Sequence, residues 1–252
     1  METPPASEEF RKEQAAFFER ADAEHFAWQT EAPYFAESEA ALLEAVAPAP
    51  RLLEIGCGEG GNLFHLAHRC ERAVGLDRSA DKLRFARGRL PAARFFRADA
   101  GHLPVREGAF DAVLIRDLLH HLPDRGLALR EARRVLRAGG TLTVIEPNGH
   151  SPLVWLQGAL VAEEREAWRS TARRLREEIC AAGFPTPALD SRQPLPVHRV
   201  ALHYRYGRPA LGRRGSVRRL FDGLDAVARR VLPRGAWLYL VAHARRPALE
   251  QP

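Results

Sequence analysis

A short apolar segment that runs directly into a cluster of glycines constrains this chain more than any other feature. Residues 51–55 form the segment, and Gly56, Gly58, Gly60 and Gly61 follow within six residues. Glycine adopts positive φ angles at no steric cost, so the chain can turn sharply here and let a ligand approach the backbone. A helix that starts after such a turn offers free N–H groups to that ligand. The pattern is typical of a strand, a turn and a helix that bind a nucleotide or a related cofactor.

The alternation of strands and helices continues downstream. Further strands are predicted at residues 73–76, 93–98, 110–115 and 141–145. The helices predicted between them cover residues 62–69, 79–89 and 123–137. Strands that alternate with helices in this way form parallel βαβ units with helices on both faces of the sheet. The sequence therefore predicts a doubly wound α/β fold.

The chain on either side of this region is less regular. Helices are predicted at residues 7–29, 37–46, 153–162, 163–182 and 217–231, and a last apolar strand at residues 236–244. Phe10, Phe17, Phe18 and Phe26 fall on one face of the first of these helices. Residues 185–196 hold four prolines, so any strand there is expected to be short or to lie at an edge of the sheet.

Composition narrows the class of protein. With 252 residues and a hydrophobic fraction of 46%, the chain has the material for one large domain. No apolar run approaches the length of a membrane span and the N-terminus lacks the apolar core of a signal peptide, so we expect a cytoplasmic protein. Cys57, Cys70 and Cys180 have neither disulfide-framework nor zinc-site spacing, and no metal is expected.

Charge is distributed unevenly along the chain. Residues 1–150 carry 20 Lys and Arg against 23 Asp and Glu, a net −3, whereas residues 151–252 carry 18 against 9, a net +9. A basic C-terminal third is expected either to meet an anionic substrate, a nucleic acid or a membrane surface, or to be a solvated face.

Acidic residues stand at the ends of the predicted strands, where parallel sheets bind ligands. Asp77 ends the second strand, where an acid accepts hydrogen bonds from ribose hydroxyls; as an alternative, it caps the next helix. Glu54 lies two residues before Gly56, where it can reach the amino group of a bound amino acid but would repel a pyrophosphate. Asp99 follows the third strand, where an acid can accept from an adenine amine.

This ordered set continues with Phe110-Asp111, with residues 116–124 and with the helix, glycine turn and strand of residues 134–142. Over about residues 45–150 it resembles the class I S-adenosyl-L-methionine (SAM)-dependent methyltransferases, in particular those acting on small molecules and lipids. The resemblance implies SAM as the cofactor in place of NAD. It also implies a mostly parallel seven-stranded sheet whose last strand is antiparallel and lies next to the fifth, a place that residues 236–244 fit.

The resemblance assigns roles to individual positions. The residues expected at SAM are Glu54, Gly56, Gly58 and Gly60 at the methionine end, Asp77 at the ribose, Asp99 and Ala100 at the adenine, Arg116 at the mouth of the fourth strand, and Arg78 beside Asp77. Residues 116–121 also resemble the corresponding piece of phosphobase methyltransferases, where a Tyr–His pair assists deprotonation of the substrate amine.

Among candidate general bases, His121 is the first choice, and Tyr34 is its expected partner. The alternative is that His121 packs or caps the start of a helix, with His120 as the fallback base.

The resemblance also suggests how the chain is divided. Residues 1–46 are expected to form a helical lid on a methyltransferase domain of residues 47–252, within which residues 147–235 contribute the acceptor pocket. If the acceptor is anionic, arginines of that region are expected to bind it; they include Arg165, Arg169, Arg173, Arg174, Arg205 and Arg208.

The expected function is methyl transfer to an O or N atom of a small-molecule or lipid acceptor. One alternative is an RNA or protein methyltransferase that docks through the arginine-rich C-terminal third, and another is a non-catalytic SAM-binding protein. The chain shows no appended RNA-binding module, which argues against a nucleic-acid partner.

Overall fold

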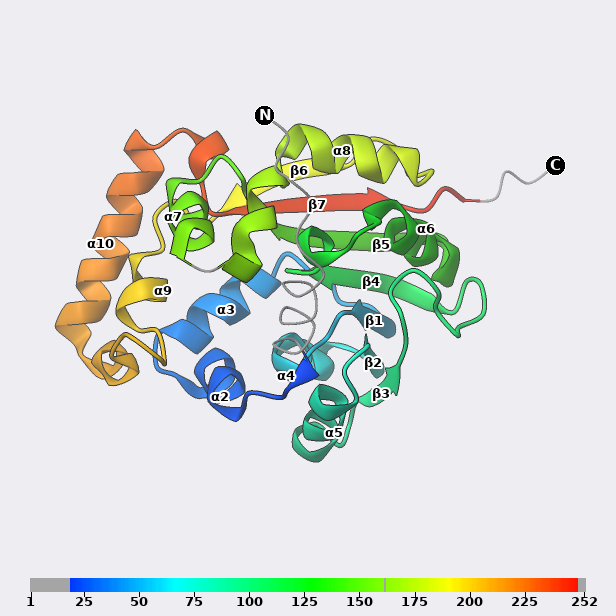
Figure 1. Cartoon of the computed structure of the whole chain (residues 1–252), viewed down its shortest axis with the longest axis horizontal. Coiled ribbons are helices and arrows are strands. Elements are labelled where there is room, and N and C mark those ends of the chain that lie inside the picture. The colour runs from blue at the N-terminus through cyan, green and yellow to red at the C-terminus, as the bar shows by residue number, and fades with distance from the viewer. Residues whose placement is uncertain (1–18, 161, 249–252) are drawn as a thin grey trace.

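The computed structural model describes residues 19–160 and 162–248. Its centre is a seven-stranded sheet in the order β3-β2-β1-β4-β5-β7-β6, as Figure 1 shows. The strands are β1 (Arg51–Ile55), β2 (Arg72–Asp77), β3 (Arg94–Arg97), β4 (Phe110–Arg116), β5 (Leu136–Pro147), β6 (Ala188–Arg192) and β7 (Tyr239–Arg245). Strands β1 to β5 run parallel to one another, and β7 runs antiparallel between β5 and β6. The predicted doubly wound sheet with a reversed strand beside the fifth is confirmed.

Helices cover both faces of this sheet. The α-helices described are α2 (Ala23–Glu31), α3 (Phe35–Leu43), α4 (Gly61–Leu66), α5 (Ala80–Arg89), α6 (Arg125–Val135), α7 (Pro152–Leu160), α8 (Ala172–Ala181), α9 (Val197–Ala201) and α10 (Gly215–Val231). Short 3-10 helices are η1 (Ala67–Arg69), η2 (Leu119–His121), η3 (Ala162–Arg169), η4 (Pro209–Arg213) and η5 (Arg234–Ala236).

The strands divide their side chains between two cores. Along β1, Leu53 and Ile55 belong to a core that includes residues of α6 and α8, whereas Leu52 belongs to a core with residues of α3, α4 and α5. In β4, Val113 and Ile115 likewise separate from Ala112 and Leu114. Since successive side chains of a strand point to opposite faces, a strand buried on both faces reads as a continuous apolar run. This is why the short apolar segments of the sequence are strands.

Several element boundaries differ from those predicted; for instance, the helix predicted at residues 7–29 is broken before α2, which begins at Ala23. Two further differences have a clear cause. Strand β5 begins at Leu136 rather than at residue 141, because the backbone of Gly139 and Gly140 pairs with Arg246 just beyond β7. The helix predicted at residues 163–182 is interrupted, since the Thr171 side chain accepts a hydrogen bond from the N–H of Arg174 and starts α8 anew. The first of these two differences comes from pairing with a distant segment, and the second from a helix cap that competes with continuation of the helix.

Helices α2 and α3 lie near the carboxyl end of the parallel strands (Figure 1). Helix α2 starts after Asp22, whose side chain accepts from the His25 N–H, while Phe10, Phe17 and Phe18 of the predicted first helix lie outside the described residues. From α3 and the turn after it, Leu42, Leu43 and Val46 enter the core beside β1. Figure 1 shows α3, α7, α9 and α10 gathered on the side toward which the parallel strands point. This is the side where doubly wound sheets bind their ligands.

Within the described part of the chain, no helix is long and apolar enough to cross a membrane.

Candidate functional site

The glycine turn after β1 forms a tight backbone cradle. Gly56, Gly58 and Gly60 all have positive φ angles, of 77°, 51° and 85°. A Cβ atom on Gly56 would lie 2.8 Å from the side chain of Leu118, so this position excludes larger residues by packing as well as by conformation. Among the described residues, a Cβ on Gly58 would come within 4 Å of Lys82 alone, at 4.0 Å. The positive φ of Gly58, rather than close packing against the described residues, therefore favours glycine here.

Asp77, at the end of β2, holds this turn in place. Its Oδ2 accepts a hydrogen bond from the Gly58 N–H at 3.0 Å, and its Oδ1 accepts from the Ser79 N–H at 2.9 Å. The cap of α5 is Ser79, whose hydroxyl accepts from the Lys82 N–H, so Asp77 is not the capping residue. The carboxylate instead links two loops at the strand ends.

The residues expected at the adenine follow β3. The Asp99 side chain is 76% exposed, and its Oδ1 accepts from the Gly101 N–H at 2.8 Å. Ala100 is buried next to it. The Ala98 N–H donates to the Asp77 carbonyl, which brings the ends of β2 and β3 together. The Arg78 side chain is exposed, and its carbonyl oxygen accepts from Arg97.

Glu54 is buried in the middle of this edge with one oxygen satisfied and the other not. Its Oε1 accepts from Asn62 Nδ2 at 2.6 Å, whereas Oε2 has no hydrogen-bond partner among the described residues. Burial raises the pKa of Glu54 to about 8, although Asn62 and the charge of Arg116 oppose the rise. A buried carboxylate oxygen without a partner is costly unless a donor reaches it. The ammonium group of an amino acid bound at the turn would supply that donor, and the residues present therefore fit the methionine end of SAM.

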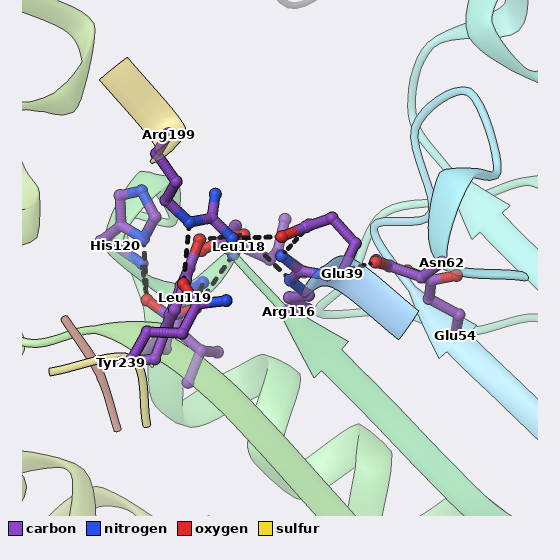
Figure 2. Close-up of polar contacts among 12 residues, drawn as sticks. Glu39, Glu54, Asn62, Arg116, Leu118, Leu119, His120, Arg199 and Tyr239 are labelled. Carbon is purple, nitrogen blue, oxygen red and sulfur yellow. Dashed lines mark hydrogen bonds and ion pairs between the residues drawn. The ribbon is translucent and has the colours of Figure 1, made fainter. Parts of the chain in front are cut away.

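Arg116 links α3 to Asn62, the residue that is hydrogen-bonded to Glu54 (Figure 2). Its Nη1 donates to Asn62 Oδ1 at 2.8 Å and its Nη2 donates to Glu39 of α3 at 2.5 Å. Arg199 of α9 also donates to Glu39. Burial alone would raise the pKa of Glu39, but the charges of Arg116 and Arg199 lower it to about 2, so this carboxylate is ionised in the interior. The Arg116 Nε also donates to Asp117, so the three guanidinium nitrogens link α3, α4 and the end of β4.

A second buried carboxylate, Glu146 at the end of β5, organises the loop after β4. It accepts from the backbone N–H groups of Leu118, Leu119 and His120, at 2.8 to 3.3 Å. Its Oε2 also lies 2.7 Å from Nδ1 of His120. Burial would raise the pKa of Glu146, but the charge and hydrogen bond of His120 lower it. An ionised Glu146 therefore fixes His120 as an Nδ1–H donor and sets the shape of η2.

The two residues expected to act as base and partner are separated. His121 lies in η2, with its ring 3.9 Å from that of His120. Tyr34 faces α10: its hydroxyl donates to Asp222 at 2.8 Å and its ring contacts Phe221 and His198. In the described part of the chain Tyr34 contacts α9 and α10 rather than His121, so the structure does not bring the predicted pair together.

Most of the arginines proposed for an anionic acceptor already have carboxylate partners. Arg169, Arg173, Arg174 and Arg205 pair with Glu166, Glu177, Glu178 and Asp22, respectively. Arg208 is exposed. Surface pairs of this kind are weak, yet they must be broken or shared before the same arginines bind another anion.

The sequence analysis did not identify three residues of this buried network. Glu39, Asn62 and Arg199 complete the buried network around Arg116, and no motif marks them. Asn62 alone carried a signal, since it is the second residue of the helix that follows the glycine turn. Among the described residues, no group of three or more His, Cys, Asp or Glu is arranged to hold a metal ion.

The comparisons with known proteins agree with this site. Residues 53–144 match the family model described as "Methyltransferase domain". A fatty-acid O-methyltransferase of Mycolicibacterium smegmatis is 40% identical over 94 residues, which are 36% of this chain and 34% of that protein. The 27-O-demethylrifamycin SV methyltransferase of Amycolatopsis mediterranei is 34% identical over 133 residues, 48% of this chain and 49% of that protein. The chain thus spans at most about half the length of these curated relatives.

A solved structure shares the fold over most of the chain. Phosphoethanolamine N-methyltransferase 2 of Haemonchus contortus superposes with a TM-score of 0.64 and 19% identity, covering 88% of this chain and 56% of that one. Residues 53–144, which match the family model, contain the end of β1, the glycine turn, Asp77, Asp99 and β4, which build the site described above. On these grounds residues 53–144 belong to the family described as a methyltransferase domain, and the fold around them is that of a solved phosphoethanolamine N-methyltransferase.

Proposed function

We propose that this protein binds SAM at the carboxyl ends of β1, β2 and β3 and transfers its methyl group to an O or N atom of a small-molecule or lipid acceptor. The observation that carries the proposal is Oε2 of Glu54, a buried oxygen beside three glycines of positive φ that finds no hydrogen-bond partner in the part of the chain that the structure describes. A carboxylate there favours an ammonium group and disfavours the pyrophosphate of a dinucleotide. Asp77 and Asp99 extend the same edge toward positions suited to a ribose and an adenine.

SAM supplies a methyl group already activated on a sulfonium, so the chain's own task is to bind, orient and exclude water. Asp77 holds the Gly58 backbone, Glu146 holds the loop of residues 118–120, and the Glu39–Arg116 pair seals the edge beneath α3. These three carboxylates fix the borders of the site from three different elements.

A general base is a separate proposal. His121 remains the candidate, because η2 follows β4 at the same edge as Glu54. Tyr34 is held by Asp222 in this structure, and its participation would require a rearrangement of α3 against α10. If His121 acts as the base without Tyr34, the rate of transfer to an amine or hydroxyl should depend on the protonation state of His121 alone.

The acceptor class rests on the named activities of the relatives, which include a fatty-acid O-methyltransferase and a methyltransferase of a rifamycin. The region between β5 and β7 is proposed as the acceptor pocket and residues 1–46 as its lid. Support for the lid comes from α2 and α3, which lie over the ligand-binding end of the sheet (Figure 1). An RNA or protein substrate, or SAM binding without catalysis, remains the alternative function.

The experiment is titration calorimetry of the protein with SAM, S-adenosylhomocysteine and NAD, followed by detection of S-adenosylhomocysteine released from SAM with fatty acids, hydroxylated lipids and amines as acceptors. Binding of SAM without NAD, together with release that depends on one acceptor class, supports the proposal. Binding of NAD without SAM would overturn the cofactor assignment. SAM binding with no release on any acceptor would favour the non-catalytic alternative.

A further inference from the structure

Helix α10 carries an apolar stripe that its own fold does not cover. Leu220, Leu224, Val227 and Val231 follow one another at spacings of four, three and four residues, so they lie along one side of the helix. They are 58%, 37%, 56% and 68% exposed, and we call them the apolar stripe. The side of α10 that packs on the protein is a different one, made by Phe221 and Ala228. An ordinary surface helix shows the reverse pattern, with polar residues facing outward.

The charges around the stripe are mostly positive. Between Arg213 and Arg234 the chain holds seven arginines against two aspartates. Both aspartates are engaged, Asp225 with Arg229 and Asp222 with the Tyr34 hydroxyl. At helical spacing Arg219 and Arg230 lie on the side of the stripe away from the packed face, and both side chains are exposed. Arg213, Arg214 and Arg234 are exposed at the two ends of the helix.

We propose that α10 docks this protein onto the surface of an anionic lipid bilayer, with the apolar stripe inserted among the acyl chains and the flanking arginines at the headgroups. A helix with an apolar stripe and an arginine-rich border is the form that interfacial helices take. Basic residues near a bilayer surface are attracted by anionic headgroups. The 17 residues of α10 would lie along the surface, in keeping with the absence of a spanning helix among the described residues.

A second copy of the chain fits the stripe less well. In a two-fold pair, the same surface of both subunits would meet, and the arginine border of one would face that of the other. The acids that could balance those arginines lie on the opposite flank and are already paired. Four side chains also fall well short of the roughly 20–30 residues a side that a stable interface uses. A nucleic acid would satisfy the arginines but leave the stripe against phosphates and water.

Docking through α10 would orient the site toward the lipid. Helix α10 is tied to the segment that carries Glu39, because Arg218 pairs with Glu37 and Asp222 accepts from Tyr34. Figure 1 shows α10 at the edge of the molecule, beyond the ends to which the parallel strands point. The bilayer contact would therefore lie on the same side of the protein as the proposed cofactor site.

The test is co-sedimentation with phosphatidylcholine vesicles that contain either no anionic lipid or about a third phosphatidylglycerol, without cofactor or acceptor. Val227→Asp is compared with Ala226→Asp, since both substitutions add one negative charge at neighbouring exposed positions and only the first lies in the stripe. We expect binding to the anionic vesicles only, a loss of about tenfold in partitioning for Val227→Asp, and a much smaller loss for Ala226→Asp. Arg219→Glu with Arg230→Glu should abolish the preference for anionic lipid.

Equal loss in Val227→Asp and Ala226→Asp, or equal binding to both vesicle types, overturns the proposal. So does light scattering that finds a dimer which Val227→Asp converts to a monomer, because a second copy would then cover the stripe. Since vesicle binding is measured without SAM, its failure leaves the proposed methyl transfer untouched, and failure of methyl transfer leaves the bilayer contact untouched.

Discussion

Glu39 of α3 and Arg116 of β4 form an ion pair in which each side chain is only 2% exposed, with Oε2 and Nη2 2.5 Å apart. The pair lies between the N-terminal segment and the centre of the sheet, and Arg199 adds a second cation to the same carboxylate. Both arginines also stand over the ring of Tyr239, at 5.6 and 5.0 Å from its centroid. Removing one member of such a buried group leaves an uncompensated charge in the interior.

Glu39→Gln should therefore destabilise the protein by about 3–5 kcal/mol, measured by urea unfolding. Glu37→Gln is the matched control, because Glu37 lies on the same helix and pairs with Arg218 at the surface. The control should cost less than about 1 kcal/mol. Similar losses in the two variants would mean that the buried pair contributes no more than a surface pair.

Asp77→Ala should weaken SAM binding by about 1.5–3 kcal/mol, because it removes the acceptor that holds the Gly58 N–H and the charged acceptor proposed for the ribose. Asp77→Asn retains one carbonyl oxygen, so its affinity for SAM should lie between that of Asp77→Ala and that of the wild type. Asp124→Ala removes the N-cap of α6 and should lower stability without changing the dissociation constant for SAM. Calorimetry measures all three; an unchanged constant in Asp77→Ala would limit Asp77 to holding the loop.

Glu54 gives a prediction for pH. Burial raises the pKa of Glu54 to about 8 in the folded protein, whereas the pKa of an unperturbed glutamate is near 4.5. Between pH 4.5 and pH 8, the folded state therefore keeps a proton on Glu54 that the unfolded state has released. Stability should fall by about 2–4 kcal/mol as pH rises from 5 to 8, and this part of the pH dependence should disappear in Glu54→Gln. Unfolding curves at several pH values measure it.

The carboxyl group of Glu54 should also couple SAM binding to the release of a proton. An ammonium group beside Glu54 favours its ionised form, so binding near pH 7 should release a proton from the wild type and none from this position in Glu54→Gln. Calorimetry in buffers of different ionisation enthalpy counts the protons released. Equal release by both proteins would show that the ammonium binds elsewhere.

The fold followed from the sequence because its signals are local. Each short apolar segment is a strand buried on both faces, and the glycines that follow β1 have the positive φ angles that only they adopt freely. Asp77 and Asp99 reach the same edge because parallel strands end there. In this region, the residues that the local sequence pattern favours are also those that the tertiary structure needs.

The contacts that the sequence did not reveal join distant segments. Glu39 meets Arg116 across 77 positions and Arg199 across 160 positions, and a glutamate within a short helix gives no sign of burial. Tyr34 was predicted beside His121 from resemblance alone, but α10 returns against α3 and Asp222 takes its hydroxyl. Such pairings depend on how the region after β5 folds back, which periodicity does not specify.

Glu146 should be the residue on which the loop after β4 depends. It accepts from three consecutive backbone N–H groups and from His120, so Glu146→Gln replaces one of these acceptors by a donor facing other donors. We expect a loss of about 2–4 kcal/mol at pH 7. Because the folded pKa of Glu146 is lowered, its contribution is complete above the unfolded value near 4.5 and is lost as pH falls below it.

The difference between wild type and Glu146→Gln should therefore shrink as pH falls from about 5 to 3. Glu107→Gln, at an exposed position paired with Arg246, is the control and should leave unfolding unchanged at pH 7. Hydrogen exchange locates the effect, since the amides of Leu118, Leu119 and His120 should lose protection in Glu146→Gln before the strands do. Retained protection of these three amides would show that the loop is held by contacts other than Glu146.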